Sequence, residues 1–471
     1  MATLNQSSLQ AGLTQHRAGN LAQAAEIYAS ISVDSADYPQ AIYLRGILAQ
    51  DLGDHKKARV LLEQALELNP KQASVCFQLA VSLNEIQETA QAITQYKKAL
   101  ELNPRYVEAL CNLGNLLKRT GETTEAIDCY RQALSVAPHV ALIHYNLGVL
   151  YQEQFKPEAA IECFRQAVRL KPNYAAAYNN LGVVLSESGQ IGDAMACYKK
   201  AQRIDPKFAD AFYNLHALLL NSEDLTPAIR CLEQAANIAP TNAHYRFFLG
   251  LLHDCNADPL SAKPYFSQPC DEPLFKADID AWNYLKTLNK ETFVIKGVAQ
   301  HTFRYALERA QLEGLVLEFG VFNGKSIRQI AKLVDGPVHG FDSFEGIPEN
   351  WNDETLGSYS TKGVLPEVPA NVTLHQGWFE NSIPIFKQTH TAPIRFMNID
   401  CDLYSSTKTV LDLLAQQITK GTVLVFDEYI GNTSWREDEH KAFHEAAQTY
   451  GWSYEVLCFS FVTKQVAFKI K

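Results

Sequence analysis

The sequence lacks the features that would tie it to a nucleic acid or a membrane. Acidic residues outnumber basic ones by 52 to 42, and a net charge of −10 leaves no basic excess for a phosphate backbone. No segment approaches the roughly eighteen uncharged apolar residues that span a bilayer, and the N-terminus has no basic stretch followed by an apolar run. We therefore expect no nucleic-acid partner, no membrane span and, by default, a cytoplasmic protein.

The ten cysteines do not indicate a disulfide framework. No pair has CxxC spacing, and four of them recur at intervals of 34 residues, which is the period of a repeat. Equivalent residues on stacked helical repeats lie about 8–10 Å apart, whereas a disulfide needs α-carbons within about 7 Å. Free thiols in a reducing compartment are therefore expected. The four are Cys129, Cys163, Cys197 and Cys231.

The composition is typical of folded domains, over a length too great for one of them. Hydrophobic residues make up 47% and charged residues 20% of the 471. Such a length predicts two or three domains. We place a repeat array over residues 1–276, a bridging segment with a helix around 278–288 over residues 277–300, and an α/β domain over residues 301–471.

A period of 34 residues runs through the first part of the chain. Prolines recur with this spacing, and small residues recur in columns between them. This period indicates a helix-turn-helix repeat in which alanine and glycine let two antiparallel helices pack closely. The prolines are Pro70, Pro104, Pro138, Pro172, Pro206 and Pro240.

These columns resemble the tetratricopeptide repeat family, whose pattern places small residues at the eighth, twentieth and twenty-seventh positions and proline at the thirty-second. The resemblance covers roughly residues 5–276 and implies about seven units. Ala36 replaces the first expected proline, so the first unit is expected to be a cap, and the last unit loses the pattern at Pro269. The family implies an all-α superhelix whose concave surface binds a protein or peptide partner.

One column of asparagines is a candidate peptide-binding site. An amide can donate to a carbonyl and accept from an N–H at once, which suits the backbone of an extended peptide. The column resembles the asparagine ladder of O-linked N-acetylglucosamine transferase, although asparagine is also common at this position across the repeat family. The four residues are Asn112, Asn146, Asn180 and Asn214.

The remainder of the chain alternates short apolar runs with amphipathic segments. This alternation predicts a Rossmann-like α/β domain with a mostly parallel sheet and an antiparallel C-terminal edge. Ligands of such sheets bind beyond the carboxyl ends of the strands. The predicted helices include 301–311 and 325–333, and the predicted strands are 315–319, 338–341, 372–375, 394–399, 422–426, 454–458 and 466–470.

A glycine-bearing turn follows the first of these strands. Glu318, Gly320 and Gly324 form an ExGxxxG pattern, in which glycine lets the backbone approach a ligand. Asp342 lies 22 residues after Gly320 at the end of the second strand, where a carboxylate can accept both hydroxyls of a ribose. The pairing suits S-adenosylmethionine or NAD. The missing GxGxxG pattern and the charge of Glu318 favour a cationic sulfonium over a pyrophosphate.

Carboxylates gather at the ends of the fourth and fifth strands. Asp400 and Asp402 follow the fourth strand, and Asp427 and Glu428 follow the fifth. Adjacent carboxylates repel one another unless a cation lies between them, and oxygen ligands favour Mg²⁺ or another hard divalent ion. Such an ion would hold a substrate hydroxyl and lower its pKa. The alternative is that these acids cap helices or face solvent.

Together these segments resemble the macrocin O-methyltransferase family, metal-dependent enzymes that methylate sugar hydroxyls. The runs EFGVFNGKSI, FDSFEGIPE, QGWFENSIP, NIDCDLYSST and VFDEY occur in the family's order over roughly residues 300–471. The resemblance implies a class I, S-adenosylmethionine-dependent methyltransferase domain, and Glu428 departs from the aspartate expected there. The implied cofactor residues are Glu318, Gly320, Gly324, Asp342, Gly377, Trp378 and Phe379, and the implied metal ligands are Asp400, Asp427 and Glu428.

The pattern leaves the general base open. Relatives use a histidine after the second strand, but residues 345–374 contain none, and Leu403 stands where catechol-type relatives have a lysine. The polar segment 350–369 is either a lid over the substrate or a loop without a catalytic task. The candidate bases are Asp400 itself, Asp353, Glu354, Tyr359 and His375.

Two functions of different classes follow. The first is an S-adenosylmethionine-dependent O-methyltransferase assisted by a divalent ion, with a sugar or glycan hydroxyl as acceptor and with repeats that recruit a protein or peptide. The second is an interaction scaffold whose α/β domain binds a nucleoside without turnover, as the missing histidine and the change at Glu428 suggest. An NAD oxidoreductase is disfavoured because the pyrophosphate loop is missing.

Overall fold

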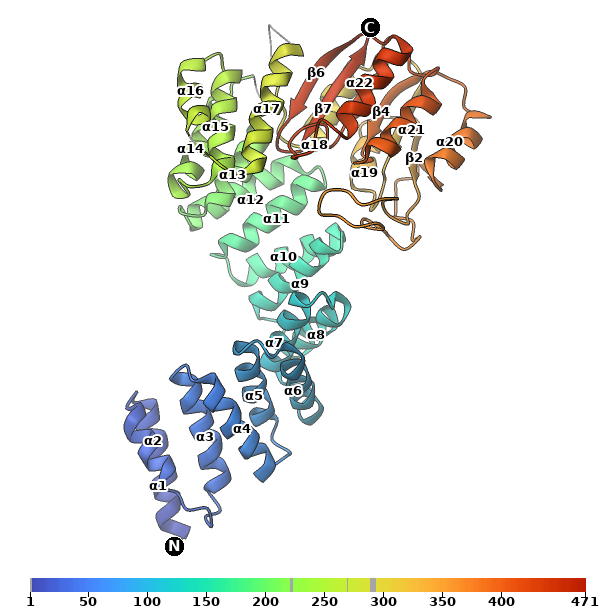
Figure 1. Cartoon of the computed structure of the whole chain (residues 1–471). Helices are drawn as coiled ribbons and strands as arrows, with labels where there is room; N and C mark the ends of the chain where they lie inside the picture. Colours follow the sequence, from blue (N-terminus) through green and yellow to red (C-terminus); the bar gives the residue numbers. More distant parts are fainter. Residues whose placement is uncertain (1, 221–222, 269, 289–293) are drawn as a thin grey trace. The chain divides into compact units, whose positions relative to one another are not determined.

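The computed structural model describes residues 2–220, 223–268, 270–288 and 294–471 (Figure 1). The predicted pattern break at Pro269 and residues 289–293 of the predicted bridge lie outside this range. Contacts between residues divide the chain into two compact units, Met1–Pro172 and Asn173–Lys471. The sequence predicts a repeat array up to residue 276, whereas compactness divides the chain at Pro172.

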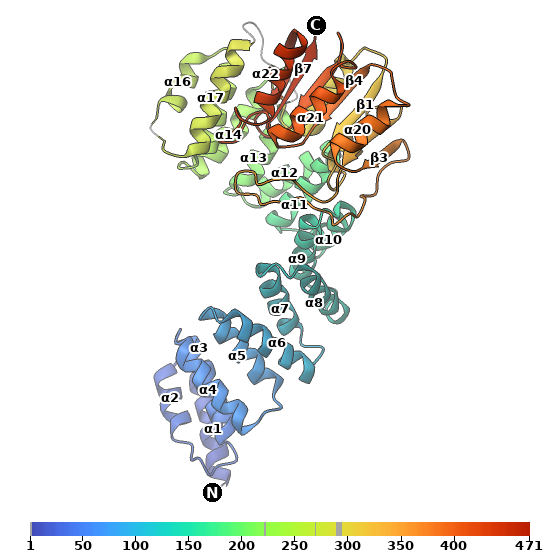
Figure 2. The same ribbon diagram turned by 45° about the vertical axis from the view of Figure 1, so that its right-hand side comes forward.

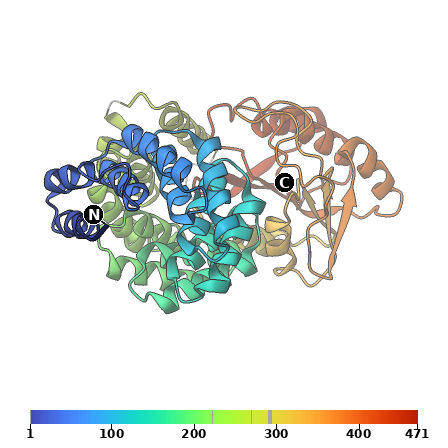
Figure 3. The ribbon, with the colours of Figure 1, turned by 90° about the horizontal axis from the view of Figure 1, so that it is seen from below.

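The first unit is an array of antiparallel helix pairs, coloured blue to cyan in Figure 3. The alanine columns of the sequence lie inside these pairs: Ala126 and Ala160 are fully buried. The large side chains Tyr130 and Phe164 fill the space beside them and are also fully buried. The helices are α1 (Ala2–Arg17), α2 (Leu21–Ala29), α3 (Tyr38–Asp51), α4 (His55–Leu68), α5 (Ala73–Glu85), α6 (Thr89–Leu102), α7 (Val107–Arg119), α8 (Thr123–Val136), α9 (Ala141–Glu153) and α10 (Pro157–Leu170).

The second unit begins with further repeat helices. The predicted helix of the bridge starts earlier than residue 278, because Pro273 suits the first position of a helix, where no N–H donor is needed. The helices are α11 (Ala175–Glu187), α12 (Ile191–Ile204), α13 (Ala209–Leu219), α14 (Thr226–Ile238), α15 (Ala243–Cys255), α16 (Pro259–Ser267) and α17 (Pro273–Leu288).

The rest of the second unit is the predicted α/β domain. Its seven described strands form one sheet in the order β3-β2-β1-β4-β5-β7-β6. Strands β1 to β5 are parallel, and β7 runs antiparallel between β5 and β6, which confirms the antiparallel C-terminal edge. The strands are β1 (Leu315–Phe319), β2 (Val338–Asp342), β3 (Val372–Gln376), β4 (Ile394–Ile399), β5 (Val423–Phe426), β6 (Tyr454–Ser460) and β7 (Gln465–Ile470).

Helices cover both faces of this sheet. Alternate residues of a strand point to opposite faces, so Val316 packs with Phe303 on one face and Leu317 joins the core of the other. Helices α20, α21 and α22 lie over the same face in Figure 2. The helices of the domain are α18 (Ala299–Arg309), α19 (Lys325–Ala331), α20 (Phe379–Lys387), α21 (Tyr404–Leu414) and α22 (Glu439–Tyr450).

The later repeats and the sheet share one hydrophobic core. The ring of Phe247 on α15 lies 4.9 Å from that of Phe461, and Trp282 on α17 lies 5.6 Å from Phe459. Apolar residues of α14, α15 and α17 therefore belong to the same buried cluster as β4 and β5.

Among the described helices, none is long and apolar enough to cross a bilayer.

Candidate functional site

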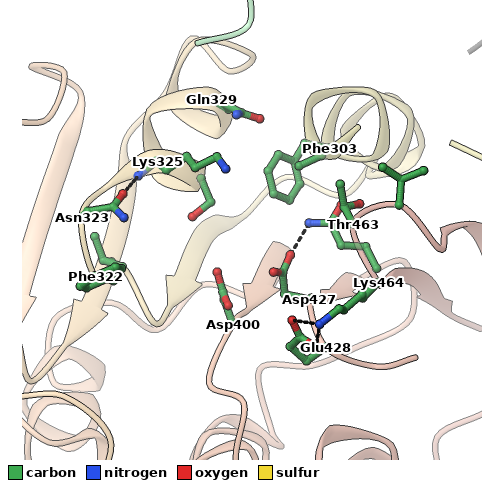
Figure 4. A pocket seen from close by; sticks show the side chains of 15 residues that line it. Phe303, Phe322, Asn323, Lys325, Gln329, Asp400, Asp427, Glu428, Thr463 and Lys464 are labelled. Atoms are coloured by element: carbon green, nitrogen blue, oxygen red, sulfur yellow. Dashed lines mark hydrogen bonds and ion pairs between the residues drawn. The ribbon is translucent and has the colours of Figure 1, made fainter. Parts of the chain in front are cut away.

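A cavity of about 350 Å³ opens beyond the carboxyl ends of β1, β4 and β5 (Figure 4). The chain runs from β1 to β2 on one side and places β4 on the other, so this is the switch point where open α/β sheets bind ligands. The volume suits a small-molecule ligand. The wall consists of Ala299, Phe303, Val321, Phe322, Asn323, Lys325, Ser326, Gln329, Asp400, Asp427, Glu428, Val462, Thr463, Lys464 and Gln465.

The turn after β1 brings two strand ends together. Gly320 has a φ of +87°, and a β-carbon there would lie 1.7 Å from the carbonyl oxygen of Asp400. The N–H of Asp400 donates to the carbonyl of Phe319 at 2.8 Å. The backbone at the end of β4 therefore approaches Gly320 closely, which accounts for the glycine at this position. Gly324 is the residue that precedes α19.

Glu318 lies beneath this turn. Its side chain is fully buried, and its carboxyl accepts a hydrogen bond from the hydroxyl of Ser326. Burial raises the pKa of Glu318 to about 8. The carboxyl is thus held neutral at pH 7, so the charge that the sequence argument assigned to this position does not face a ligand.

Asp342 connects the first two strand ends. Its Oδ2 accepts from the N–H of Phe322 at 2.7 Å, and its Oδ1 accepts from the N–H of Phe344 at 2.6 Å. The N–H of Gly377 donates to its carbonyl at 2.9 Å. The predicted ribose acceptor therefore already receives backbone donors on both oxygens.

The remaining predicted cofactor residues form the start of α20. Trp378 precedes the helix, and Phe379 packs edge to face on Phe319 with ring centroids 5.5 Å apart. Among the residues that the structure describes, no predicted cofactor residue is part of the cavity wall. Val321, Phe322, Asn323, Lys325 and Ser326 form that part of the wall, because Glu318 and Gly320 are covered by the turn.

The predicted acids do meet at the cavity. Asp400 and Asp427 both line it, and burial together with repulsion from neighbouring carboxylates raises the pKa of each, that of Asp427 to about 7. Asp402 belongs to the same group: burial, then repulsion from Glu428, raises its pKa to about 7. Its backbone has a φ of 60°, a conformation rare for aspartate. The spacing Asp400-Cys-Asp402 was the sequence signal for this residue.

The hairpin between β6 and β7 supplies partners for the acids of β5. Phe426 of β5 is paired with Val466 of β7. Continued by two residues, this antiparallel register places Gln465 opposite Asp427 and Lys464 opposite Glu428. Accordingly, the amide of Gln465 donates to Asp427. The Nζ of Lys464 lies 3.0 and 3.1 Å from the two carboxylate oxygens of Glu428 (Figure 4).

The predicted metal ligands do not fit a metal site in this arrangement. Both oxygens of Glu428 accept from Lys464, which leaves them turned toward a lysine. Within the described ranges, no group of three or more His, Cys, Asp or Glu side chains could hold a metal ion. Asp400 and Asp427 meet as predicted, but Glu428 does not complete a ligand set with them.

Glu439 is a site residue that the sequence analysis missed. It is fully buried at the start of α22, where its Oε1 accepts from the N–H of Cys401 at 3.3 Å. Its Oε2 has no hydrogen-bond partner among the described residues. Burial, then repulsion from Asp402 and Asp427, raises its pKa. Glu439 thus fixes the backbone between Asp400 and Asp402.

Two of the candidate bases, Tyr359 and His375, lie in different surroundings. Tyr359, in the predicted lid, packs edge to face on Phe322 of the cavity wall at 5.8 Å, and burial with repulsion from Asp402 raises its pKa to about 12. His375 lies under α20, with its Nε2 3.2 Å from Nδ1 of His339. Tyr359 therefore reaches the site, whereas His375 belongs to a separate cluster.

The asparagine column is divided between the two units. All four residues are half-buried. In the first unit, Asn146 donates to Asn115 at 3.2 Å, and in the second, Asn214 donates to Asn179 at 2.9 Å. Two amides of the column thus donate to asparagines that lie outside it.

A repeat helix contacts the cavity wall. The Nζ of Lys325 lies 2.7 Å from the carboxylate of Glu187, the last residue of α11, and the amide of Gln329 donates to the carbonyl of Glu187 at 2.7 Å. Lys325 and Gln329 both line the cavity. The Oε1 of Gln329 is buried and has no partner within the described part of the chain.

Family models match both parts of the chain. Tetratricopeptide repeat models match residues 39–72, 82–121, 105–173, 163–196 and 185–222, and a methyltransferase domain model matches residues 317–429. A search of curated proteins finds no match.

Solved structures with similarity to the chain include repeat proteins. YrrB, described as a TPR protein with an unusual peptide-binding site, is 27% identical over 39% of this chain and 95% of its own, with a TM-score of 0.35. MamA is 26% identical over 35% and 96%, with a TM-score of 0.34. PilF of Pseudomonas aeruginosa is 24% identical over 45% and 96%, with a TM-score of 0.40.

Proposed function

We propose that this chain, a tetratricopeptide repeat region fused to a methyltransferase domain, is an S-adenosylmethionine-dependent O-methyltransferase whose repeats hold the partner that carries the acceptor hydroxyl. The observation that carries the proposal is the cavity at the β1–β4 switch point, where Asp400 and Asp427 meet. It lies within the domain that the methyltransferase model matches.

The chemistry of the wall suits the cofactor. S-adenosylmethionine, when bound, supplies an electrophilic methyl group on a cationic sulfur. Buried carboxyls at Asp400 and Asp427 favour a positive charge beside them. The unpartnered Oε1 of Gln329 can accept a hydrogen bond from a ligand donor. Phe322 adds an aromatic ring to the wall, and Tyr359 packs edge to face on it.

The acids can accept the proton of the hydroxyl. A carboxyl with a raised pKa is a better proton acceptor than an ordinary aspartate. Burial and mutual repulsion raise the pKa of Asp400, and they raise those of Asp402 and Asp427 to about 7. Asp400 lines the cavity and is our proposed base. Asp402 and Asp427 repel the charge of Asp400, so the three carboxyls titrate as a group.

The divalent ion predicted from the sequence is not part of this mechanism. Asp400, Asp427 and Glu428 do not form a ligand set, because Lys464 binds both oxygens of Glu428. We therefore derive no step through a metal ion.

The repeats are proposed to present the acceptor. Asn180 and Glu187 are seven residues apart on α11, which places them on one face of the helix about 10 Å apart. A peptide bound over Asn180 would therefore end near Lys325 and Gln329 of the cavity wall. The resemblance to macrocin O-methyltransferases supports a sugar or glycan hydroxyl as the acceptor group.

Calorimetric titration and methyl transfer test the proposal together. The full chain should bind S-adenosylmethionine and its demethylated product, S-adenosylhomocysteine (the homocysteine product). It should also transfer a labelled methyl group to a component of a native lysate. Asp400→Asn should keep the affinity for the product and slow transfer by about 10²–10⁴-fold, the usual effect of losing a general base. Failure to bind either ligand at high micromolar concentration would end the proposal.

The scaffold hypothesis makes a different prediction. Binding of the homocysteine product without transfer to any acceptor, in wild type and Asp400→Asn alike, would favour a nucleoside-binding scaffold. A kcat/KM that rises with pH, with a rise that Asp400→Asn removes, would favour the enzyme, because the base must lose its proton before it can act.

A further inference from the structure

The acid cluster contains a lysine at the place where the sequence predicts a divalent ion. Asp400, Asp402, Asp427 and Glu428 stand at two neighbouring strand ends, and such a group needs a positive charge among its members. Lys464 provides one, with its Nζ within 3.1 Å of both oxygens of Glu428. The geometry is a fork, with one ammonium shared by two carboxylate oxygens.

The backbone fixes Lys464 in this place independently of the ion pair. The N–H of Ile430 donates to the carbonyl of Lys464 at 3.3 Å, which joins the hairpin to the loop after Glu428. Lys464 has a φ of 57°. Gly431 makes room for its stem, since a β-carbon there would lie 2.9 Å from Cγ of Lys464. The lysine is thus positioned by the strand register, a turn and a glycine.

The other lysine of the cavity wall points elsewhere. Lys325 places its Nζ 2.7 Å from Glu187 on helix α11. Its side chain is 48% exposed, against 40% for Lys464, and its ion-pair partner belongs to the repeats, although its charge also lowers the pKa of Asp427. Lys464 is therefore the lysine of the wall that bonds directly to an acid of the cluster.

We propose that Lys464 is the resident cation of this site. Its ammonium binds both carboxylate oxygens of Glu428 and holds the acid cluster together. The site is therefore independent of a divalent metal ion. That methyl transfer needs no metal ion rests on the proposed function, whereas the weak binding of metal ions to the wild-type site does not. A metal ion could use Glu428 only by displacing an ammonium that is already positioned by the hairpin. Removing that ammonium should free both oxygens for a hard cation.

Titration of the metal-stripped full chain with Mn²⁺, followed by the electron spin resonance of free Mn²⁺, tests the proposal. Wild type should show no saturable site in the micromolar range. Lys464→Met should create a single site at least about tenfold tighter than any in wild type, and Lys464→Arg should not. Lys441→Met is the matched control, because Lys441 makes a pair of the same length, 3.0 Å, with Glu437 on the surface of α22.

Two results would overturn the proposal. One is a saturable micromolar Mn²⁺ site in wild type that Asp400→Asn or Asp427→Asn removes. The other is a Lys464→Met variant with the circular dichroism spectrum and cooperative thermal melting of wild type that binds Mn²⁺ no better than the Lys441→Met control. If Lys464→Met does not fold, Glu428→Gln decides, since it should leave the Mn²⁺ titration of wild type unchanged. In an active preparation, a chelator should not alter the rate of methyl transfer.

Discussion

The helices α1–α10 and the helices α11–α17 are held in place differently, although repeat models match helices of both groups. In the first unit, buried alanines and aromatic residues pack between neighbouring helices, and each repeat depends on the next. In the second, Phe247 and Trp282 enter the core of a sheet that follows them in the chain. A repeat can therefore be a self-contained stack or the wall of another domain, and the periodic pattern does not distinguish the two.

The largest effect should come from truncating the chain at two different points. A fragment of residues 301–471 loses the cover that α15 and α17 give to Phe459 and Phe461, so it should aggregate or unfold. A fragment of residues 173–471 keeps that cover and should melt cooperatively. Size-exclusion chromatography and thermal melting of both fragments check this. A stable, monomeric 301–471 fragment would show that the shared core is dispensable.

The next largest effects should come from two matched substitutions, one in the core of each unit. Trp282→Ala and Phe164→Ala each remove a fully buried ring and should cost about 3–5 kcal/mol of local stability. Trp282→Ala should also lower the melting temperature of the sheet and weaken binding of the homocysteine product. Phe164→Ala should leave both unchanged. Calorimetry with two resolved transitions is the measurement, and equal effects of the two variants on ligand binding would contradict the division into units.

The buried Glu318 should give the second unit a pH dependence that the first lacks. The folded pKa is raised from 4.5 to about 8, so between these values the unfolded chain releases a proton that the folded chain keeps. Stability is therefore lost as the pH rises from 4.5 to 8. At pH 7 the loss is about 3 kcal/mol, at about 1.4 kcal/mol per pH unit.

Glu318→Gln should remove this dependence. The variant should match wild type at pH 5, where Glu318 is protonated in the folded protein, and exceed it at pH 7. Urea unfolding at both pH values measures the difference. A Glu318→Gln variant that is less stable than wild type at pH 7 would show that Glu318 is ionised in the folded protein.

The smallest effects should come from the contact between α11 and α19. Glu187→Gln weakens an ion pair whose side chains are 39% and 48% exposed, so it should change stability by less than about 1 kcal/mol. Gln329→Leu removes a buried amide that donates to the carbonyl of Glu187 and should cost about 1–3 kcal/mol. Thermal melting of both variants ranks them, and the reverse order would mean that the ion pair holds the two helices together.

Much of the fold could be predicted from local pattern. The predicted strands 315–319 and 394–399 agree with β1 and β4 to the residue, because buried parallel strands read as short apolar runs. Helix ends were less well predicted: α17 begins at Pro273, before the expected residue 278. Helix starts depend on caps and neighbouring contacts, which an apolar period does not record.

The site was predicted in part. The meeting of Asp400 and Asp427 followed from their places at the ends of parallel neighbouring strands. Lys464, Glu439 and Gln329 were not found, since each reaches the site from an element distant in sequence. The role given to Glu318 was wrong in one respect, because only the tertiary structure shows that the turn buries it.

The sequence by itself determined the repeat period, the α/β alternation and the chemistry of the acids, because each is written in residues that are close together along the chain. The tertiary structure alone decided which charge faces those acids and which repeats belong to the sheet. The antiparallel register of β5 and β7 sets Lys464 opposite Glu428. Such a pairing depends on how two distant strands align, and no local pattern specifies that alignment.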